Sequence, residues 1–270
     1  MEKELLNTLR NKGLVPETYE ETFLQRTLEK RMADCGCDDW AKYEWLLNNN
    51  HHEMSKLKEC LTVSYTEFFR NQYSFAAIEK ILLPLLLKSK STSRQKELRV
   101  WSAACATGQE AYSMSMLFHE NVASSSDNLK LRVFGTDVDP AQVALAMKAE
   151  YSRTNLNHVT LQRLARWFIQ QGERYTLQDT IKENVEFSCF DLLDDELMYP
   201  PTSIFGGFDL VFCANLLFYY HIDAQHKILN KVNNSLNESG YLIVGEAERD
   251  ILVNEGFVEI LPHTGIFKKK

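Results

Sequence analysis

Long apolar runs are missing from this sequence of 270 residues, and their absence limits what the chain can be. No uninterrupted apolar stretch approaches the roughly 20 residues that a membrane-spanning helix needs. The longest, residues 81–87, is broken by Pro84. The first residues, MEKELLNTLRNKG, are charged and lack the apolar core of a signal peptide. The sequence therefore predicts a protein without membrane insertion, and we expect a cytoplasmic location.

An excess of basic residues is also missing. The chain has 30 Lys and Arg against 37 Asp and Glu, a formal net charge of −7 and a pI near 5.6. A nucleic-acid-binding protein normally presents a basic face to the phosphates, so no nucleic-acid partner is expected. The hydrophobic share of 44% and the charged share of 25% are typical of globular proteins. The length allows one α/β core and a small accessory domain.

The cysteines lack metal-binding patterns. None of the six forms a CxxC pair or has histidine neighbours at ligand spacing. The only local cluster is Cys35-Gly36-Cys37, in a segment typical of a turn, where a metal would lack further ligands. We therefore expect no metal, and reduced, mostly buried thiols as in cytosolic proteins.

The N-terminal part of the chain shows helical periodicity. Apolar residues recur at helical spacing over 19–32, and similar faces follow at 39–47 and 53–61. These segments predict a helical domain over residues 1–72. A further helix over 74–87 and the polar stretch 88–96 predict a helix and linker over 73–96.

After residue 96 short apolar strands alternate with helical segments, which indicates βαβ units and a parallel sheet. We therefore expect a doubly wound α/β domain over residues 97–270, with an antiparallel last strand at the sheet edge. The polar segment before the third strand predicts a helix over 161–169 and a strand over 174–177, as part of an insertion at about 171–184. The predicted strands are 98–103, 131–136, 185–189, 208–213, 240–245, 257–261 and 266–268, the last two joined as a hairpin.

Polar residues follow several of these strands, where open α/β sheets bind their ligands. The loop 103–110 has small residues that allow close backbone approach, but lacks the three glycines of the dinucleotide fingerprint. A simple tight turn is its alternative interpretation. Asp137 ends the second strand, where a carboxylate can accept both hydroxyls of a ribose. Asp139 precedes Pro140 and is expected to cap a helix. Asp191, after the third strand, could meet an adenine amino group.

Four motifs resemble those of the chemotaxis receptor methyltransferase family, CheR, and they occur in the family's order over nearly the whole chain. Residues 64–70, SYTEFFR, resemble N/S-x-T-x-F-F-R. Residues 99–113 resemble the segment RVWSA…TGEEPYS, and residues 136–139, TDVD, match S/T-D-I-D. Residues 208–219, FDLVFCANLLFY, match F-D-x-I-F-C-R-N-V-x-I-Y.

The resemblance implies a class I methyltransferase fold, Rossmann-like, with a mostly parallel seven-stranded sheet. It implies transfer of a methyl group from S-adenosylmethionine, leaving S-adenosylhomocysteine, to glutamate side chains on the cytoplasmic helices of chemoreceptors. Arg70 and Tyr219 would flank the reacting centre as catalytic residues. The cofactor would be bound by Ser64, Thr66, Arg70, Ala104, Glu110, Asp137, Asp191, Leu192, Ala214 and Asn215. Phenylalanines 68, 69, 212 and 218 are expected in the core.

The chain departs from the family at three positions on functional loops: Gln109 replaces a glutamate, Ala111 a proline and Ala214 an arginine. These departures leave two alternatives open, a catalytically silent module that binds a signalling partner, and a methyltransferase with another acceptor. A nicotinamide-dependent dehydrogenase is disfavoured by the missing glycines. The family's helix that meets the receptor is basic, whereas here the helix over 19–32 carries mixed charge, which suits a solvated face or a docking face. We expect a monomer.

Overall fold

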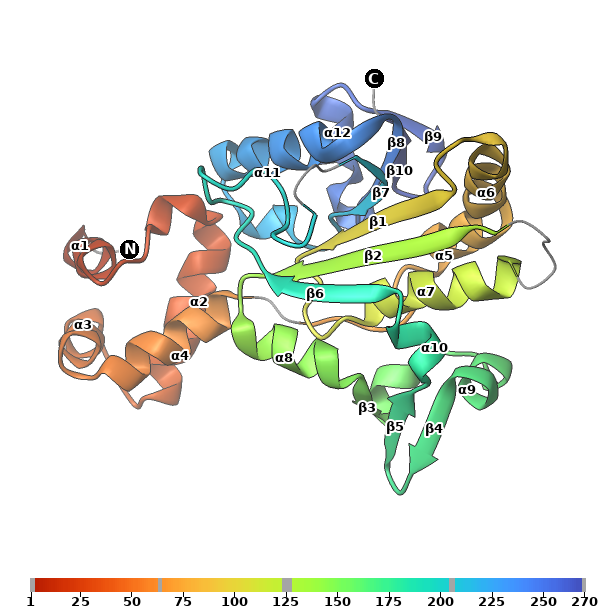
Figure 1. Cartoon of the computed structure of the whole chain (residues 1–270). Helices are drawn as coiled ribbons and strands as arrows, with labels where there is room; N and C mark the ends of the chain where they lie inside the picture. The colour runs from red at the N-terminus through yellow and green to blue at the C-terminus, as the bar shows by residue number, and fades with distance from the viewer. Residues whose placement is uncertain (1–2, 63–64, 123–127, 204–206, 269–270) are drawn as a thin grey trace. The chain divides into compact units, whose positions relative to one another are not determined.

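The computed structural model describes residues 3–62, 65–122, 128–203 and 207–268 (Figure 1). The chain divides into two compact units, Met1–Val63 with Leu216–Lys227, and Ser64–Asn215 with Ile228–Lys270. The division thus falls at residues 63 and 64, where the sequence pattern suggested residue 72, and a segment from the C-terminal half joins the helical unit. Within the described residues, none of the helices has both the length and the apolar character that crossing a membrane requires.

The first unit is built from helices around a leucine-rich core. The sequence indicated α2, α3 and α4, but not α1, whose nine residues are rich in charge. Helix α2 is capped by the side chain of Glu20, α3 by that of Asp39 and α4 by that of Asn50, each accepting main-chain N–H groups. The elements are α1 Lys3–Asn11, η1 Pro16–Thr18, α2 Glu21–Asp34, α3 Trp40–Asn49, α4 His51–Leu61 and the short helix η4 Leu217–Tyr219.

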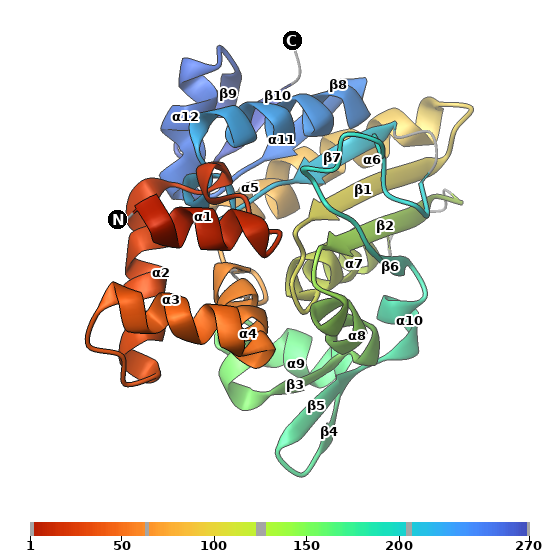
Figure 2. The same ribbon diagram turned by 90° about the vertical axis from the view of Figure 1, so that its left-hand side faces the viewer.

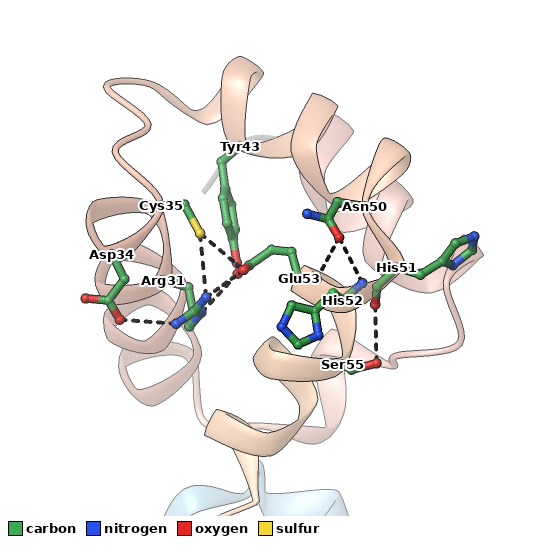
Figure 3. Close-up of polar contacts among 9 residues, drawn as sticks. All are labelled: Arg31, Asp34, Cys35, Tyr43, Asn50, His51, His52, Glu53 and Ser55. Atoms are coloured by element: carbon green, nitrogen blue, oxygen red, sulfur yellow. Dashed lines mark hydrogen bonds and ion pairs between the residues drawn. The ribbon is translucent and has the colours of Figure 1, made fainter.

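A buried glutamate connects three of these helices (Figure 3). Glu53 of α4 is only 4% exposed. Its carboxylate accepts hydrogen bonds from Arg31 Nε (2.9 Å) and Nη2 (2.6 Å) on α2, and from the Tyr43 hydroxyl (3.0 Å) on α3. Cys35 Sγ, just after α2, lies 3.1 Å from the same carboxylate. Burial alone would raise the pKa of Glu53, but the hydrogen bonds from Arg31, Cys35 and Tyr43 outweigh it and lower that pKa.

The second unit contains a seven-stranded sheet in the order β6-β2-β1-β7-β8-β10-β9. The strands from β6 to β8 pair in parallel, and β10 is antiparallel to both of its neighbours. This confirms the doubly wound, mostly parallel sheet with an antiparallel last strand. Their bounds are β1 Glu97–Ala103, β2 Lys130–Asp137, β6 Val185–Cys189, β7 Phe208–Phe212, β8 Leu236–Ile243, β9 Val258–Leu261 and β10 Ile266–Lys268.

One detail of the predicted topology was wrong. The last strand, β10, does not lie at the edge, because the hairpin places it between β8 and β9, and β9 forms the edge. The chain leaves β8, passes through η5 (Glu246–Glu248) and α12 (Arg249–Asn254) to the outermost position, and returns through β10 to complete the hydrogen bonding of β8.

Helices cover both faces of the sheet in Figures 1 and 2. Helices α5 (Gln72–Ala77), α6 (Leu83–Thr92), α7 (Gln109–Val122) and α8 (Pro140–Lys148) lie on one face. The C-terminal part of α11 (Ile222–Ser235) and α12 lie on the other. A π-helical turn, η2 Ile78–Leu82, joins α5 to α6. The linker expected from residue 88 was wrong as far as Thr92, because α6 continues to that residue.

The insertion forms a second, three-stranded antiparallel sheet in the order β3-β5-β4. Its strands are β3 Glu150–Ser152, β4 Phe168–Gln171 and β5 Arg174–Leu177, and η3 (Arg153–Leu156), α9 (Leu161–Trp167) and α10 (Asp179–Lys182) accompany them. The insertion predicted at about 171–184 therefore covers only part of this region. Phe68 packs against it, its ring centroid 4.8 Å from that of Tyr151 and 5.4 Å from that of Phe168.

The pKa of Glu53 predicts how the stability of the helical unit depends on pH. Because the folded pKa is lowered, the ionised carboxylate contributes stability above the unfolded pKa of 4.5, and this is lost as the pH falls through the folded value. Glu53→Gln should lower the free energy of unfolding by about 2–4 kcal/mol at pH 7, because it leaves Arg31 without its buried counter-charge. The deficit measured by urea titration should shrink below pH 4.5.

Glu59→Gln, at an exposed position of the same helix, is the matched control and should change little. Equal losses from both substitutions would show that Glu53 has no special role.

Candidate functional site

The carboxyl ends of four parallel strands lie together along one side of the large sheet, an edge distinct from the outermost strand β9. Ala103 at the end of β1 lies opposite Thr136 of β2, and Asp137 lies opposite Cys189 at the end of β6. On the other side of β1, Ser102 lies opposite Phe212 at the end of β7. The strand order reverses at β1, so the loops that follow these strands meet where doubly wound sheets bind ligands.

Asp137 connects the loop after β1 with the end of β2. It is 8% exposed, and its Oδ2 accepts the main-chain N–H of Ala106 at 2.8 Å while Oδ1 accepts that of Asp139 at 3.0 Å. Burial raises the pKa of Asp137, and the two hydrogen bonds oppose that shift. Each carboxylate oxygen has two lone pairs, so Asp137 keeps acceptor capacity for a ligand. Asp139 caps α8 through the Ala141 N–H at 2.8 Å, which confirms its expected role.

The loop after β1 has a strained backbone. Ala104 and Ala106 have φ of 56° and 47°, in the left-handed region that costs a residue with a Cβ about 1–2 kcal/mol. The Cys105 N–H binds the carbonyl of Thr136 at 2.8 Å, which with the Asp137 contact holds the loop in this form. Backbone strain of this kind is more typical of a ligand-binding loop than of a simple tight turn. The sequence pattern did not indicate the strain.

Close packing beneath the loop requires glycine at position 135. A Cβ added there would lie 2.4 Å from the ring of Phe187 on β6. The aromatic ring thus occupies the space that a side chain at this position would need, and brings β6 close to the loop.

Glu110 lies in the first turn of α7 and accepts the hydroxyl hydrogen of Ser102 at 2.7 Å. Desolvation of its carboxyl group is the main cause that raises the pKa of Glu110 to about 7. The charge of Glu248 raises it further, whereas the Ser102 hydrogen bond and the charge of Arg70 lower it. The site therefore holds a carboxyl group that a positively charged ligand would ionise.

Arg70 is positioned by the segment before α5. The N–H of Phe69 donates to Ser113 Oγ at 3.2 Å, and Ser113 lies one turn after Glu110 on α7. Arg70 Nη1 donates to the Tyr65 carbonyl at 2.8 Å. Thr66 is half-buried in the same segment, and Ser64 lies outside the described residues.

The loops after β6 and β7 carry the remaining predicted residues. Asp191 is exposed and its Oδ1 accepts the Leu193 N–H at 2.8 Å, while Leu192 is 8% exposed. Ala214 and Asn215 are half-buried, and Asn215 has a φ of 62°. The structure thus places the predicted residues of this unit at the carboxyl ends of the strands, in the loops that follow them or in the first turn of α7: Ala104, Glu110, Asp137, Asp191, Leu192, Ala214 and Asn215.

Glu248 is a further residue of this edge that the sequence analysis missed. It is fully buried, and its Oε2 accepts the N–H of Asn215 and that of Gly245, each at 2.7 Å. It therefore ties the loop after β7 to the loop after β8. A glutamate at the third position of a helical turn after a small residue is the available signal, because this spacing is that of a capping box.

Tyr219 belongs to the first unit, not to the unit that carries Arg70. Its ring centroid lies 4.8 Å from that of Phe23 and 4.2 Å from that of Phe218, and its carbonyl accepts the Glu20 N–H at 2.9 Å. Its role beside Arg70 stays a prediction.

Two expectations about burial need correction. Phenylalanines 68, 69 and 212 are buried as predicted, but Phe218 is only half-buried, because it lies in a short helix that follows the loop after β7. All six cysteines are free thiols, yet only Cys105 and Cys213 are buried, since the others lie on surface turns, helix ends or an edge strand. Among the described residues, no group of three or more His, Cys, Asp or Glu side chains is arranged to hold a metal ion.

Comparison with known proteins gives one family and several relatives. Residues 64–262 match the family model described as CheR methyltransferase, SAM binding domain. A chemotaxis protein methyltransferase 1 of Pseudomonas aeruginosa is 32% identical, over 87% of this chain and 85% of the relative. A chemotaxis protein methyltransferase of Listeria monocytogenes is 29% identical, over 89% and 86%. An uncharacterised 104.1 kDa protein of Rhodobacter capsulatus is 32% identical over 88% of this chain, which spans only 24% of that protein.

The raised pKa of Glu110 predicts a pH dependence of stability. Between pH 4.5 and about 7 the folded protein keeps a proton that the unfolded chain releases, so the free energy of unfolding falls as the pH rises through this window. Glu110→Gln removes this pH dependence, because an amide does not titrate. We expect the variant to be more stable than the wild type at pH 8 by about 1–3 kcal/mol, and to lose that advantage at pH 4.5.

The measurement is urea unfolding from pH 4.5 to pH 8, with Glu150→Gln at an exposed site of the same unit as control. A wild-type and variant difference that stays constant with pH would contradict the assigned pKa.

Proposed function

We propose that this chain methylates glutamate side chains on the cytoplasmic helices of chemoreceptors. The starting point is that the chain belongs to the CheR methyltransferase family. The chain is an S-adenosylmethionine-dependent methyltransferase. The observation that carries the proposal is the conjunction of the family match with a carboxylate, Asp137, that is held at the end of β2 and retains acceptor capacity.

The chemistry of the edge fits S-adenosylmethionine. Its diol suits the Asp137 carboxylate. Its positive charge suits Glu110, a half-buried carboxyl group that accepts the Ser102 hydroxyl hydrogen and whose pKa is raised by desolvation. Asp191 and Leu192 would hold the adenine. Ser64, Thr66, Ala104, Ala214 and Asn215 would line the remaining cofactor surface together with Arg70. When bound, the cofactor supplies a methyl group on a sulfonium, and a nucleophilic displacement at the methyl carbon can transfer this group to the acceptor.

Arg70 has the properties of a group that orients an acceptor carboxylate. A glutamate is already ionised near neutral pH, so no general base is needed, and the protein's task is alignment and the exclusion of water. A guanidinium presents five N–H donors in a planar fork, and Arg70 uses one of them on the Tyr65 carbonyl. The family resemblance implies that Tyr219 also flanks the reacting centre.

The remaining assignments are part of the same proposal. We assign the first unit, Met1–Val63 with Leu216–Lys227, to a helical domain and the second unit to the methyltransferase domain, in a cytoplasmic monomer. Helix α2 would meet the receptor. The mixed charge of this helix and the loss of an arginine at Ala214 keep two competing functions in view, a silent module and an enzyme with another acceptor.

A transfer assay separates these functions. Purified protein is incubated with methyl-labelled S-adenosylmethionine and receptor-enriched membranes, and the label is followed as base-labile glutamyl methyl ester. Label on receptors supports the proposal. Cofactor binding by calorimetry without any transfer would indicate a silent module, and label on other proteins alone would indicate another acceptor.

Two substitutions should separate binding from turnover. Asp137→Ala should weaken S-adenosylhomocysteine binding about 10–100-fold, because two hydrogen bonds to a charged acceptor are lost and the loop after β1 is released. Arg70→Ala should lower kcat by about 100-fold, through loss of acceptor alignment, while the cofactor Kd changes less than about threefold. Calorimetry and labelled transfer measure the two effects, and full turnover in the Arg70 variant would refute its role.

A further inference from the structure

The contacts of Tyr65 hold Arg70 from two directions. The main-chain carbonyl of Tyr65 accepts from Arg70 Nη1 at 2.8 Å, and the guanidinium carbon of Arg70 lies 5.0 Å from the centroid of the Tyr65 ring. Both contacts come from one residue, so the conformation of Tyr65 sets the direction of the guanidinium. Tyr65 is 61% exposed, however, and packing alone does not fix so exposed a ring.

Glu67 supplies the missing restraint. Its Oε1 accepts the hydroxyl hydrogen of Tyr65 at 2.7 Å, and its side chain is only 14% exposed. This hydrogen bond raises the pKa of Tyr65 above its usual value, since ionisation would place two negative charges side by side. The tyrosine ring is therefore held at its far end by a shielded carboxylate and at its near end by the main chain.

The insertion that contains the three-stranded sheet also contacts Glu67. His158, in the segment between η3 and α9, places Nε2 3.0 Å from Glu67 Oε2. The other ring nitrogen of His158 lies 2.8 Å from Gln72 Nε2 at the start of α5. Phe68, the next residue, packs against Tyr151 and Phe168 of the small sheet. The insertion thus holds the segment that carries Arg70 by an apolar and a polar contact.

We propose that Glu67 is a positioning residue, which fixes Arg70 for methyl transfer through the hydroxyl and ring of Tyr65 and is itself held by His158. The inference rests on the proposed function, because it gives Glu67 a role through Arg70.

The first test uses the full-length protein and measures kcat, acceptor KM and the Kd of S-adenosylhomocysteine. Tyr65→Phe removes only the hydroxyl, and Glu67→Gln removes only the charge and one acceptor. Each should lower kcat about fivefold, as expected for a loosened orienting group, with the cofactor Kd unchanged within about twofold. Tyr73→Phe and Glu173→Gln, at exposed positions of the same unit, are the matched controls and should leave kcat unchanged.

The same substitutions in an Arg70→Ala background distinguish positioning from general support of the fold. If Glu67 acts through Arg70, Glu67→Gln has no further effect on the residual turnover of Arg70→Ala. An equal drop in both backgrounds, or an unchanged kcat in the wild-type background, would overturn the proposal.

A second measurement needs no acceptor. NMR titration of tyrosine-labelled protein should show the pKa of Tyr65 falling toward its usual value in Glu67→Gln, and the Arg70 Nε signal shifting in Tyr65→Phe. Unchanged signals would overturn the inference while leaving the receptor assignment untouched. Altered signals in a protein that transfers no methyl group would uphold the contacts and reject the proposed function on which their role depends.

Discussion

The bonds of one carboxylate determine the shape of the site. Asp137 accepts the N–H groups of Ala106 and Asp139, and so holds a loop whose backbone would otherwise relax. The left-handed conformations of Ala104 and Ala106 are tolerated because this anchor and the Cys105 contact to β2 compensate their cost. The same carboxylate is the group that we assign to the sugar of the cofactor. Structure and recognition therefore depend on one side chain.

Other carboxyl groups at the edge act in the same manner. Glu248 holds the loops after β7 and β8 together. The pKa of Glu110 is raised by the charge of Glu248 and lowered by that of Arg70. A carboxyl group that loses solvation on burial is costly unless a cation or hydrogen bonds compensate it. A cationic ligand reduces that cost, which is why a sulfonium cofactor suits this edge better than a neutral or anionic one.

The sequence predicted the sheet well, because buried parallel strands such as 131–136 and 208–213 are short, mostly apolar segments with clear ends. It also predicted Asp137 and the cap at Asp139, since both follow from their position after a strand. It missed α1, whose charged surface hides its apolar side, and β3, which has only three residues. It also missed β4 (Phe168–Gln171), where the helix predicted over 161–169 ends at Trp167 instead. Glu248, the positive φ angles and the chain from His158 to Arg70 depend on contacts between distant segments, which periodicity does not encode. The place of Tyr219 beside Arg70 stays a prediction, because those residues belong to different units.

The central claim is that Asp137 binds the sugar of the methyl donor while Arg70 faces the reacting side. A crystal structure of the protein with S-adenosylhomocysteine tests it most directly. Both ribose hydroxyls should lie within hydrogen-bonding distance of Asp137, about 2.5–3.0 Å, with the Arg70 guanidinium on the side of the thioether sulfur. A nucleoside bound away from the end of β2, or an arginine turned away from the sulfur, would contradict it.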